Sequence, residues 1–414
     1  MTTSNQRPET AYVWTWLPGA TEPVIAGRVD ERAGFVTFTY ALSYRQRPDA
    51  ISLYTPELPL RPGTFEPADG LTIPGSLRDG SPDSWGRSVI RYHQRAAEQD
   101  ITEIGYLLLS GTNRFGANDF QISRTDYVPR LDTASLDELV EAATRINEGK
   151  PVSEPLADAL QHGTAIGGAR PKVLLRGDDG VEWIAKLSSS SDQAFSVVRS
   201  EATYLELARR VGIRVPTTKL IRSAGRDVLL VERFDRIPGG GRRHVVSGLT
   251  IARLDEMNGR YATYPQILEG IRSRGRTGFV DPGPEFFDRI AFNIAVGNSD
   301  DHARNHAAFW DGTELELTPA YDLAPNARSG ETSTQALAFD SQGKERSSQF
   351  SALVRHAREY GLDRTDAAAR VDLLVDGIER NWDAAAEIGE LSANDKAYLW
   401  RRQVLNPYAF YAEP

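Results

Sequence analysis

The chain has 414 residues, of which 40% are hydrophobic and 25% charged, and its formal net charge is −9. This length and composition are typical of a globular protein with roughly two or three structural units, and they exclude a disordered, collagen-like or coiled-coil chain. The sequence contains no cysteine, which excludes disulfides, thiolate nucleophiles and cysteine-bound metal clusters. The negative charge disfavours a broad nucleic-acid surface.

No apolar run reaches the about 20 residues that span a bilayer. The polar start of the chain lacks the order of a secretion signal. We therefore expect a cytoplasmic protein that does not interact with a membrane.

In chain order, residues 11–125 have the short alternating runs and Gly/Pro turns of strands, with one predicted helix at 83–99. An amphipathic helix is predicted at 135–148, where Ser135 and Glu138 have the spacing of a capping box. The next part mixes strands with a helix: strands at 172–176, 182–187, 217–222 and 227–234, and a helix at 193–211.

The glycine-rich stretch 237–243 predicts a flexible linker. Beyond it the chain is mainly helical, with helices at 284–296 and within 366–405, and a hairpin of strands 306–310 and 314–317. The predicted organisation is therefore a β-rich domain over 1–125, a small α+β unit over 126–236 and a mainly helical unit over 237–414.

The most informative motif is Gly297-Asn-Ser-Asp-Asp-His-Ala-Arg-Asn-His306, which lies between the predicted helix and the hairpin. Tyr321-Asp322 follows the hairpin, so the fold of this region would bring Asp300, Asn305 and Asp322 together. In phosphoryl transfer one carboxylate accepts the proton of the attacking hydroxyl, while an amide and a second carboxylate hold magnesium against the nucleotide phosphates. The five-residue step from Asp300 to Asn305 is the spacing of a kinase catalytic loop.

Two other interpretations of this motif are weaker. The polar residues would also suit a simple turn stabilised by Asn and Asp side chains. His302 and His306 have the spacing of a zinc-binding helix, but the glutamate that a zinc protease needs after the first histidine is replaced by Ala303.

Lys186 lies in the apolar strand Trp183-Ile-Ala-Lys-Leu187, where a charged amine needs an anion. Only six of the 48 basic residues are lysine, which favours a specific use of this one over a solvent-directed side chain. In a nucleotide kinase such a lysine contacts phosphates and is steered by a carboxylate from the next helix. Glu201 is the available partner.

Two further segments fit a nucleotide site. The glycine-bearing stretch 163–172 precedes the Lys186 strand, where backbone amides could approach phosphates, although it lacks the full G-x-G-x-x-G pattern. The strand 228–234 ends at the predicted linker, where its backbone could pair with adenine.

Taken together, these segments resemble the HipA family, the toxin kinases of bacterial toxin–antitoxin pairs. The matching segments occur in the family's order along nearly the whole chain: 78–87, 167–172, the strand of Lys186, Glu201 with 207–213, 232–236, 297–305 and Tyr321-Asp322.

The resemblance implies an α+β, two-lobed protein-kinase-like fold, with a small α+β lobe, a mainly helical large lobe and an additional β-rich N-terminal domain. It implies Asp300 as catalytic base, with Asn305 and Asp322 as magnesium ligands. The implied ATP site comprises Gly167, Gly168, Ala169, Arg170, Pro171 and Lys172 over the phosphates, Lys186 with Glu201, Glu232, Arg233 and Phe234 at adenine, and His302, Asn305, Tyr321 and Asp322.

The resemblance also implies transfer to Ser or Thr of a host protein, such as an aminoacyl-tRNA synthetase, with inhibition of growth. The implied partner is a small DNA-binding antitoxin, through which any DNA contact would be made. Two alternatives stay open: a kinase of lipids or small-molecule hydroxyls that shares D-x-H-x-x-N, and a catalytically silent module that binds an antitoxin.

One position departs from the family pattern. Family members often carry a serine in the glycine loop, seven residues before the matching lysine, and its phosphorylation silences the kinase. That position is Ala165 here. We therefore expect no self-inactivation of the usual kind.

Overall fold

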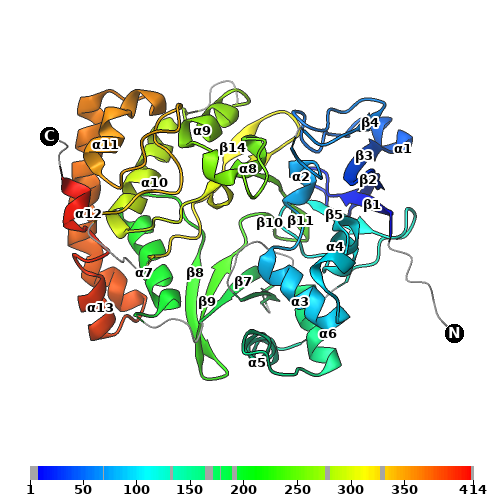
Figure 1. Cartoon of the computed structure of the whole chain (residues 1–414), viewed down its shortest axis with the longest axis horizontal. Coiled ribbons are helices and arrows are strands. Elements are labelled where there is room, and N and C mark those ends of the chain that lie inside the picture. The colour runs from blue at the N-terminus through cyan, green and yellow to red at the C-terminus, as the bar shows by residue number, and fades with distance from the viewer. Residues whose placement is uncertain are drawn as a thin grey trace.

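The computed structural model describes residues 8–68, 70–130, 134–163, 171–177, 179–188, 194–275, 280–326 and 332–411. Figure 1 shows three parts: the N-terminal sheet on the right, a small sheet with its helices below, and a helical part on the left. No helix in these ranges is both long and apolar enough to cross a membrane.

The N-terminal part is an antiparallel sheet of order β4-β3-β2-β1-β5. Its strands are β1 (Thr10–Thr15), β2 (Val24–Arg32), β3 (Phe35–Tyr40), β4 (Thr64–Phe65) and β5 (Asn118–Gln121). Its helices are α1 (Leu42–Arg45), α2 (Gly75–Arg78), α3 (Ser84–Gln94) and α4 (Glu103–Leu109), with a 3₁₀ turn at Glu98–Asp100.

The prediction of a single helix in this part, at 83–99, was wrong. The helix α3 ends at Gln94, and the short helices α1 and α2 and the longer helix α4 are further helices that the sequence did not predict. The short apolar run of α4 is equally compatible with a buried strand, so its periodicity does not predict a helix. Ile104 and Leu107 pack into the core of the sheet, and Thr102 caps the helix through the Gly105 N–H.

The second part is an antiparallel sheet of order β6-β7-β9-β8 with three helices. These elements are β6 (Lys172–Arg176), β7 (Glu182–Leu187), α7 (Val197–Arg210), β8 (Thr218–Ser223) and β9 (Arg226–Glu232), preceded by α5 (Leu136–Asn147) and α6 (Glu154–Gly163). The capping box is confirmed, because the Ser135 hydroxyl accepts from the Glu138 N–H and Glu138 accepts from the Ser135 N–H.

The helix α3 joins the core of this second part. Trp85 and Val89 of α3 pack with Leu139 of α5 and with Val173 and Ala185 of the small sheet. A helix from the first 125 residues thus holds the N-terminal part against the small sheet, to the right of β7 and above α6 in Figure 1.

The glycine-rich stretch after β9 is a hairpin and not the flexible linker that its composition predicted. Its strands are β10 (Arg236–Ile237) and β11 (Gly241–Arg242), and Gly239 and Gly240 turn between them with φ of +89° and +99°. Glycine reaches such angles without the steric cost of a side chain, so these residues serve a tight turn. The Arg242 guanidinium lies 3.5 Å from the centre of the Trp16 ring, which fixes the hairpin to the N-terminal part.

The third part surrounds the helix α10 (Gly283–Val296). A three-stranded sheet comprises β12 (His244–Ser247), β13 (Ala307–Trp310) and β14 (Leu315–Leu317). The other helices are α8 (Gly248–Ile251), α9 (Tyr264–Arg272), α11 (Phe350–Arg355), α12 (Arg364–Ile388) and α13 (Ala393–Leu399), with 3₁₀ turns at Gly259–Tyr261, Ala303–Asn305, Ala357–Tyr360 and Pro407–Phe410.

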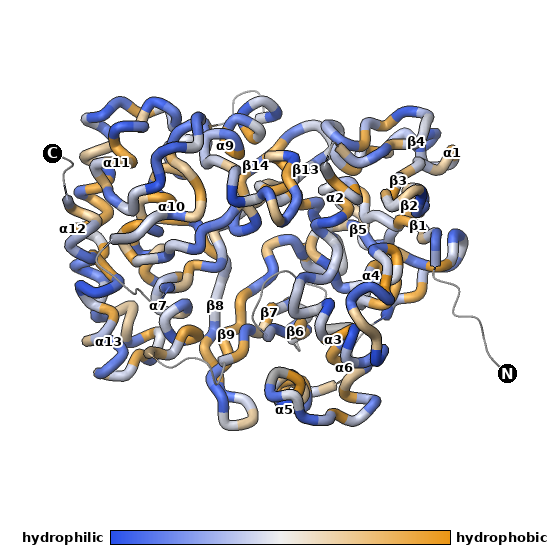
Figure 2. Tube along the Cα trace, in the orientation of Figure 1, coloured by the Kyte–Doolittle hydropathy of each residue, from blue (hydrophilic) through white to orange (hydrophobic). Residues whose placement is uncertain are grey.

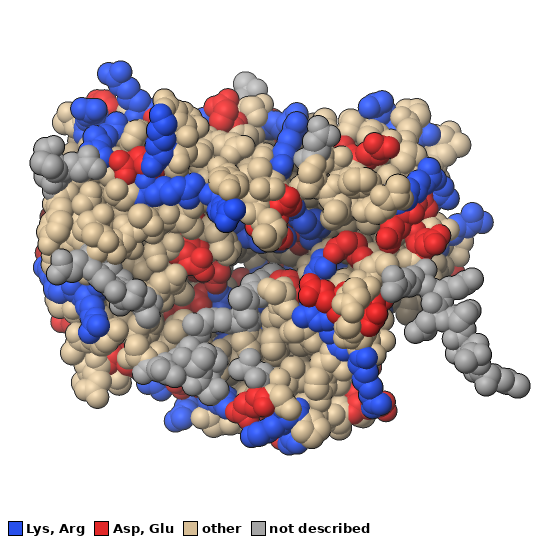
Figure 3. All heavy atoms as spheres, viewed as in Figure 1, with Lys and Arg blue, Asp and Glu red and all other residues tan. Residues whose placement is uncertain are grey.

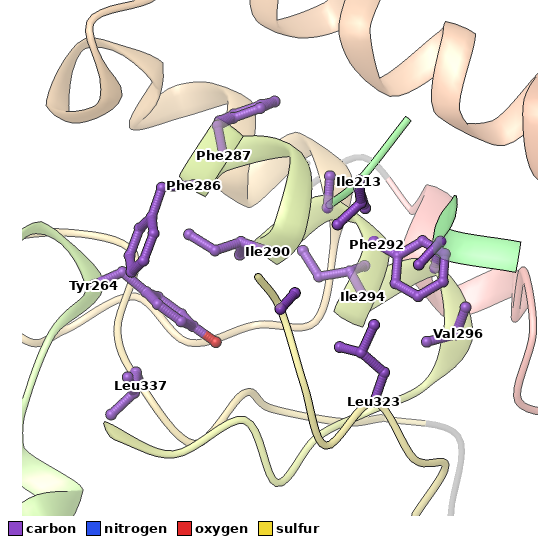
Figure 4. Packing of buried hydrophobic residues seen from close by; sticks show 14 of the residues in the cluster. Ile213, Tyr264, Phe286, Phe287, Ile290, Phe292, Ile294, Val296, Leu323 and Leu337 are labelled. Carbon is purple, nitrogen blue, oxygen red and sulfur yellow. The ribbon is translucent and has the colours of Figure 1, made fainter. Parts of the chain in front are cut away.

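The helix α10 is buried and supports the loop 297–306 that follows it. Its Phe286, Ile290 and Ile294 pack with Tyr264 and Leu323 in the largest hydrophobic core (Figure 4). Figure 2 places hydrophobic residues along the interior strands β7 and β9, while α12 alternates between hydrophobic and hydrophilic residues. The loop after α10 therefore leaves a fully packed helix.

Candidate active site

A cavity of about 690 Å³ lies where the three parts meet, and residues from all three line it. Its size is that of a small-molecule or nucleotide site. The small sheet contributes Ile184 and Lys186, the third part contributes Asn305 and Asp322, and the N-terminal part contributes the loop 78–84. On the face in Figure 3 a hollow opens between the parts, and basic and acidic side chains are interspersed around it without a continuous basic surface.

Lys186 is directed into the cavity by strand alternation. Trp183, Ala185 and Leu187 of β7 are buried, whereas Ile184 and Lys186 lie on the cavity side. The Lys186 ammonium donates to the Asp322 carboxylate, with 2.5 Å between Nζ and Oδ1, and also to Glu201 Oε1. The predicted pairing of Lys186 with Glu201 is thus present, and Asp322 is a second partner.

The charges of Lys186 and Asp322 hold each other in the ionised state. Burial alone would lower the pKa of Lys186, but the carboxylates of Asp322 and Glu201 outweigh it and raise that pKa. Lys186 in turn holds the pKa of Asp322 well below its usual range. The pKa of Glu201 is raised because its side chain is buried, which the charge of Lys186 offsets only in part. Asp322 therefore stays an anion throughout the physiological pH range.

Asp322 also has an unusual backbone, with a φ of +61°. Few residues other than glycine occupy this left-handed region, and Asp and Asn do so more readily than most. The Asp322 side chain keeps 43% of its surface exposed, so its carboxylate remains accessible although one oxygen is paired with Lys186.

Lys172 lies directly opposite Lys186 in the pairing of β6 with β7. Side chains of directly opposed residues extend on the same side of a sheet, so both ammonium groups reach the cavity. Burial, together with the charge of Lys186, lowers the pKa of Lys172. Its Nζ lies 3.3 Å from Asp83 Oδ2, and the other oxygen of Asp83 accepts from the Gly86 N–H at the start of α3. The sequence placed Lys172 near phosphates but gave no sign of this link to the N-terminal part.

The predicted glycine loop is described only in part. Gly167, Gly168, Ala169 and Arg170, together with Thr164 and Ala165, lie outside the described residues. Pro171 is described, and its carbonyl accepts from the Leu187 N–H at 3.1 Å, which holds the end of this segment against the Lys186 strand.

The loop after α10 brings Asp300 and Asn305 together. The Asn305 amide donates from Nδ2 to the backbone carbonyl of Asp300 at 3.2 Å, which leaves its Oδ1 for a cation. The pKa of Asp300 is raised by partial desolvation of its carboxyl and by the charges of nearby Asp322 and Asp301, against the opposing effect of His302. The Asn305 amide oxygen and the ionised carboxylate of Asp322 line the same cavity, and such oxygens suit magnesium, which usually takes one or two protein ligands and completes its shell with phosphates and water.

The two histidines of this loop face different surroundings. His302 is exposed and lines the cavity, whereas His306 is buried and contacts Asp301 Oδ2 at 3.0 Å. The Tyr264 hydroxyl donates to the same Asp301 oxygen at 2.8 Å. His306 therefore belongs to a buried network under the loop, and among the described residues no three His, Asp or Glu side chains gather as a metal site. This geometry gives the zinc interpretation no support.

The segment Glu232–Phe234 lines the cavity at the end of β9. The N–H groups of Glu232 and Arg233 already donate to the carbonyls of Thr217 and Glu182. The Arg233 side chain turns away into the N-terminal part, where it contacts Asn113 Oδ1 at 2.6 Å. An adenine base would therefore meet backbone carbonyls and the Phe234 ring, and not the arginine side chain.

Aromatic rings complete this side of the cavity. Phe234 contacts Tyr321 and Phe115, with ring centres 5.6 Å and 6.0 Å apart. The Tyr321 hydroxyl donates to the backbone carbonyl of Arg304 at 2.6 Å, which ties the Tyr321-Asp322 segment to the loop of Asp300 and Asn305. The loop of Asp300 and Asn305 and the segment Tyr321-Asp322 therefore lie together, as predicted from the sequence.

The fold is an α+β, two-lobed protein-kinase-like fold with an additional β-rich N-terminal domain. Residues 164–382, more than half of the sequence, match the family model described as the HipA-like C-terminal domain. The chain therefore belongs to the HipA family.

Similar proteins agree with this assignment. A protein of Shewanella oneidensis named serine/threonine-protein kinase toxin HipA is 28% identical over 38% of this chain and 42% of its own length. A putative kinase of Sinorhizobium fredii is 27% identical over 35% of this chain and 37% of its own length. Each match thus spans about two fifths of the curated relative.

A solved structure from Shewanella oneidensis, of HipA with HipB and operator DNA, covers 93% of this chain and 94% of its own with a TM-score of 0.67. Its sequence identity is 17%, so this likeness concerns the fold.

Proposed function

We propose that the protein is an ATP-dependent serine/threonine kinase and the toxin of a toxin–antitoxin pair. The observation that carries this proposal is the contact of Lys186 with both Glu201 and Asp322 inside a cavity that Asn305 also lines. Phosphoryl transfer depends on positioned charges of this kind more than on covalent chemistry by the protein.

In the proposed reaction, Lys186 and Lys172 bind phosphates, and Glu232, Arg233 and Phe234 border the base. Asp322 and Asn305 would hold magnesium, which would neutralise charge on the transferred group. Asp300 accepts the proton of a Ser or Thr hydroxyl as its oxygen bonds to the γ-phosphorus and the bond to the ADP oxygen breaks. His302 and Tyr321 border the same site, and Gly167 to Pro171 would cover the phosphates.

We propose the domain division 1–125, 126–236 and 237–414, with the second and third units as the small and large lobes. The proposed partners are a host protein substrate and a small DNA-binding antitoxin, as in the HipA, HipB and DNA complex of similar fold. The net charge of −9 supports a DNA contact made through that partner.

Incubation with γ-labelled ATP and magnesium tests the class of acceptor, with host extract, lipid vesicles and the purified antitoxin as separate acceptors. We expect label on an extract protein at Ser or Thr. Label on lipid would support a lipid kinase instead, and no label on any acceptor, with the antitoxin still bound, would support a silent binding module.

The raised pKa of Asp300 predicts the pH dependence of transfer. Protonated Asp300 cannot accept a proton, so activity falls as the pH drops through its pKa. Because that pKa is raised, the acid limb of kcat/KM should lie above the pKa of about 4 of an ordinary aspartate. A profile of kcat/KM against pH measures this limb, and activity that stays flat down to about pH 4 would remove Asp300 from the proton transfer.

We also expect no self-silencing through the glycine loop. Ala165 has no hydroxyl, and neighbouring side chains of an extended chain point to opposite sides, which disfavours Thr164 as a substitute. Mass spectrometry after prolonged incubation with Mg-ATP should find little phosphate on Thr164. Stoichiometric phosphate there, with loss of activity, would mean that the switch has moved by one residue.

A further inference from the structure

The wall of the cavity formed by the N-terminal part holds a buried arginine with unused donors. Arg78, at the end of α2, is 8% exposed and lines the cavity. Its Nη1 donates to the Leu254 carbonyl at 2.8 Å, but Nε and Nη2 have no hydrogen-bond partner among the described residues. A buried guanidinium with donors left unpaired is costly, so it favours any anion that reaches it.

Ser81 presents a further donor at the same place. Its N–H donates to the Arg78 carbonyl at 2.8 Å, which closes a turn and holds the two residues side by side. The Ser81 hydroxyl is buried, lines the cavity and also lacks a hydrogen-bond partner in the described part of the chain. The turn thus groups three unused donors, two on a guanidinium and one on a hydroxyl.

The carboxylates around this turn are already occupied. Asp79 accepts from the N–H and the hydroxyl of Ser247, and Asp255 accepts from Asn258. The remaining acids form ion pairs: Asp83 with Lys172, Glu103 with Arg87, and Glu256 with Arg304. Arg78 is therefore the basic group of this wall that forms no salt bridge within the described residues, although its charge helps to lower the pKa of Asp255 and of Glu256.

Contacts place this turn beside the catalytic loop. Arg78 binds the carbonyl of Leu254, and two residues later Glu256 pairs with Arg304, which lies between Asp300 and Asn305 in the sequence. The Lys186 side of the cavity holds the charges proposed for ATP. The turn of Arg78 and Ser81 belongs to the wall formed by the N-terminal part, and the proposed mechanism assigns neither residue to ATP, so both are free for the molecule that carries the hydroxyl.

We propose that Arg78 and Ser81 form a subsite for a carboxylate of the acceptor protein, an Asp or Glu side chain close to the phosphorylated Ser or Thr. Arg78 would bind it through Nε and Nη2 after a rotation of its flexible side chain, which is common when partners bind. A nucleic-acid phosphate fits less well, since a chain of net charge −9 with so many cavity carboxylates disfavours polyanions. This inference rests on the proposed kinase function and assigns its substrate preference.

Kinetics with the labelled extract protein test the subsite. We expect Arg78→Gln to raise KM for that protein about tenfold and Ser81→Ala to raise it severalfold, with kcat and Mg-ATP affinity little changed. Arg253→Gln is the matched control, because it removes one charge from an exposed residue next to Leu254 that does not line the cavity. Thermal unfolding of each variant checks that the fold is intact, and Ser81→Ala keeps the test valid if Arg78→Gln does not fold.

The acceptor supplies the other half of the test. Changing an acidic residue near its phosphorylated site to the amide should raise KM for the wild-type kinase, and should have little further effect on Arg78→Gln. The subsite would be overturned, and the kinase function left intact, if neither kinase variant changed KM for the acceptor. It would also be overturned if the amide acceptor changed KM by the same factor for the wild type and for both kinase variants.

A second readout does not depend on transfer. In nitrogen-15 NMR of the full chain, the Arg78 Nε–H signal, identified by its loss in Arg78→Gln, should shift saturably with sodium acetate and not with sodium chloride at equal ionic strength. Ser81→Ala should weaken this response. If the wild type transfers no phosphate, the proposed kinase function fails. The acetate titration then still tests whether Arg78 and Ser81 bind a carboxylate, and the absence of a saturable shift would overturn that proposal.

Discussion

Replacing Asp300 by Asn should lower phosphoryl transfer by about 10²–10⁴-fold while Mg-ATP affinity stays largely intact. The substitution removes the group that accepts the hydroxyl proton, yet Asp300 contributes to the loop through its backbone carbonyl, which Asn305 contacts and which the substitution preserves. Steady-state transfer to the extract protein measures the loss, and calorimetric titration measures nucleotide binding.

Asp301→Asn is a control for the charge of this loop. Asp301 is buried under the loop with Tyr264 and His306, so its loss should reduce stability while transfer persists. Because the charge of Asp301 contributes to the raised pKa of Asp300, the acid limb of the remaining activity should move to lower pH. Transfer by Asp300→Asn within about tenfold of the wild type would exclude Asp300 as the base.

Replacing Asp322 by Ala should weaken Mg-ATP binding by about 100-fold or more, with a similar or larger loss in turnover. Loss even of a group that supports a metal ligand typically costs 10–100-fold, and Asp322 is proposed as a ligand itself. The substitution also leaves Lys186 with Glu201 as its remaining carboxylate partner. Calorimetry with ATP, in the presence and absence of magnesium, separates the metal contribution from that of the lysine.

Asp322→Asn distinguishes charge from backbone conformation. At a φ of +61°, alanine would add strain of about 1–2 kcal/mol, whereas Asn accepts this conformation as Asp does. Both variants should lose magnesium-dependent affinity, and Ala alone should lose additional thermal stability. Mg-ATP affinity that is unchanged in Asp322→Asn would contradict the role of Asp322 as a metal ligand.

Local signals predicted the elements that surround the proposed catalytic residues. The capping box of Ser135 and Glu138 starts α5, and the hairpin of β13 and β14 separates the loop of Asp300 from Asp322. Both depend on residues close in sequence, which is why pattern and spacing identified them. The pair of Lys186 and Glu201 was also predictable, because a lysine on an apolar strand needs an anion and the next helix supplies one.

Features that depend on contacts between distant segments were not predictable. The link of Lys172 to Asp83 joins residues 89 positions apart, and the unused donors of Arg78 depend on where residues 247–256 lie. Composition alone gave a wrong prediction at Gly239 and Gly240, because glycines are equally compatible with a flexible linker and with a tight hairpin turn. The packing of Arg242 on Trp16 stabilises the hairpin.

The kinase proposal is tested most directly by transfer of the γ-phosphate of labelled ATP to host protein, measured side by side for the wild type and Asp300→Asn. We expect the wild type to label one or a few proteins at Ser or Thr in the presence of magnesium, and Asp300→Asn to bind Mg-ATP without labelling them. Folded wild type that binds Mg-ATP but labels nothing, or equal labelling by both proteins, would contradict the proposal.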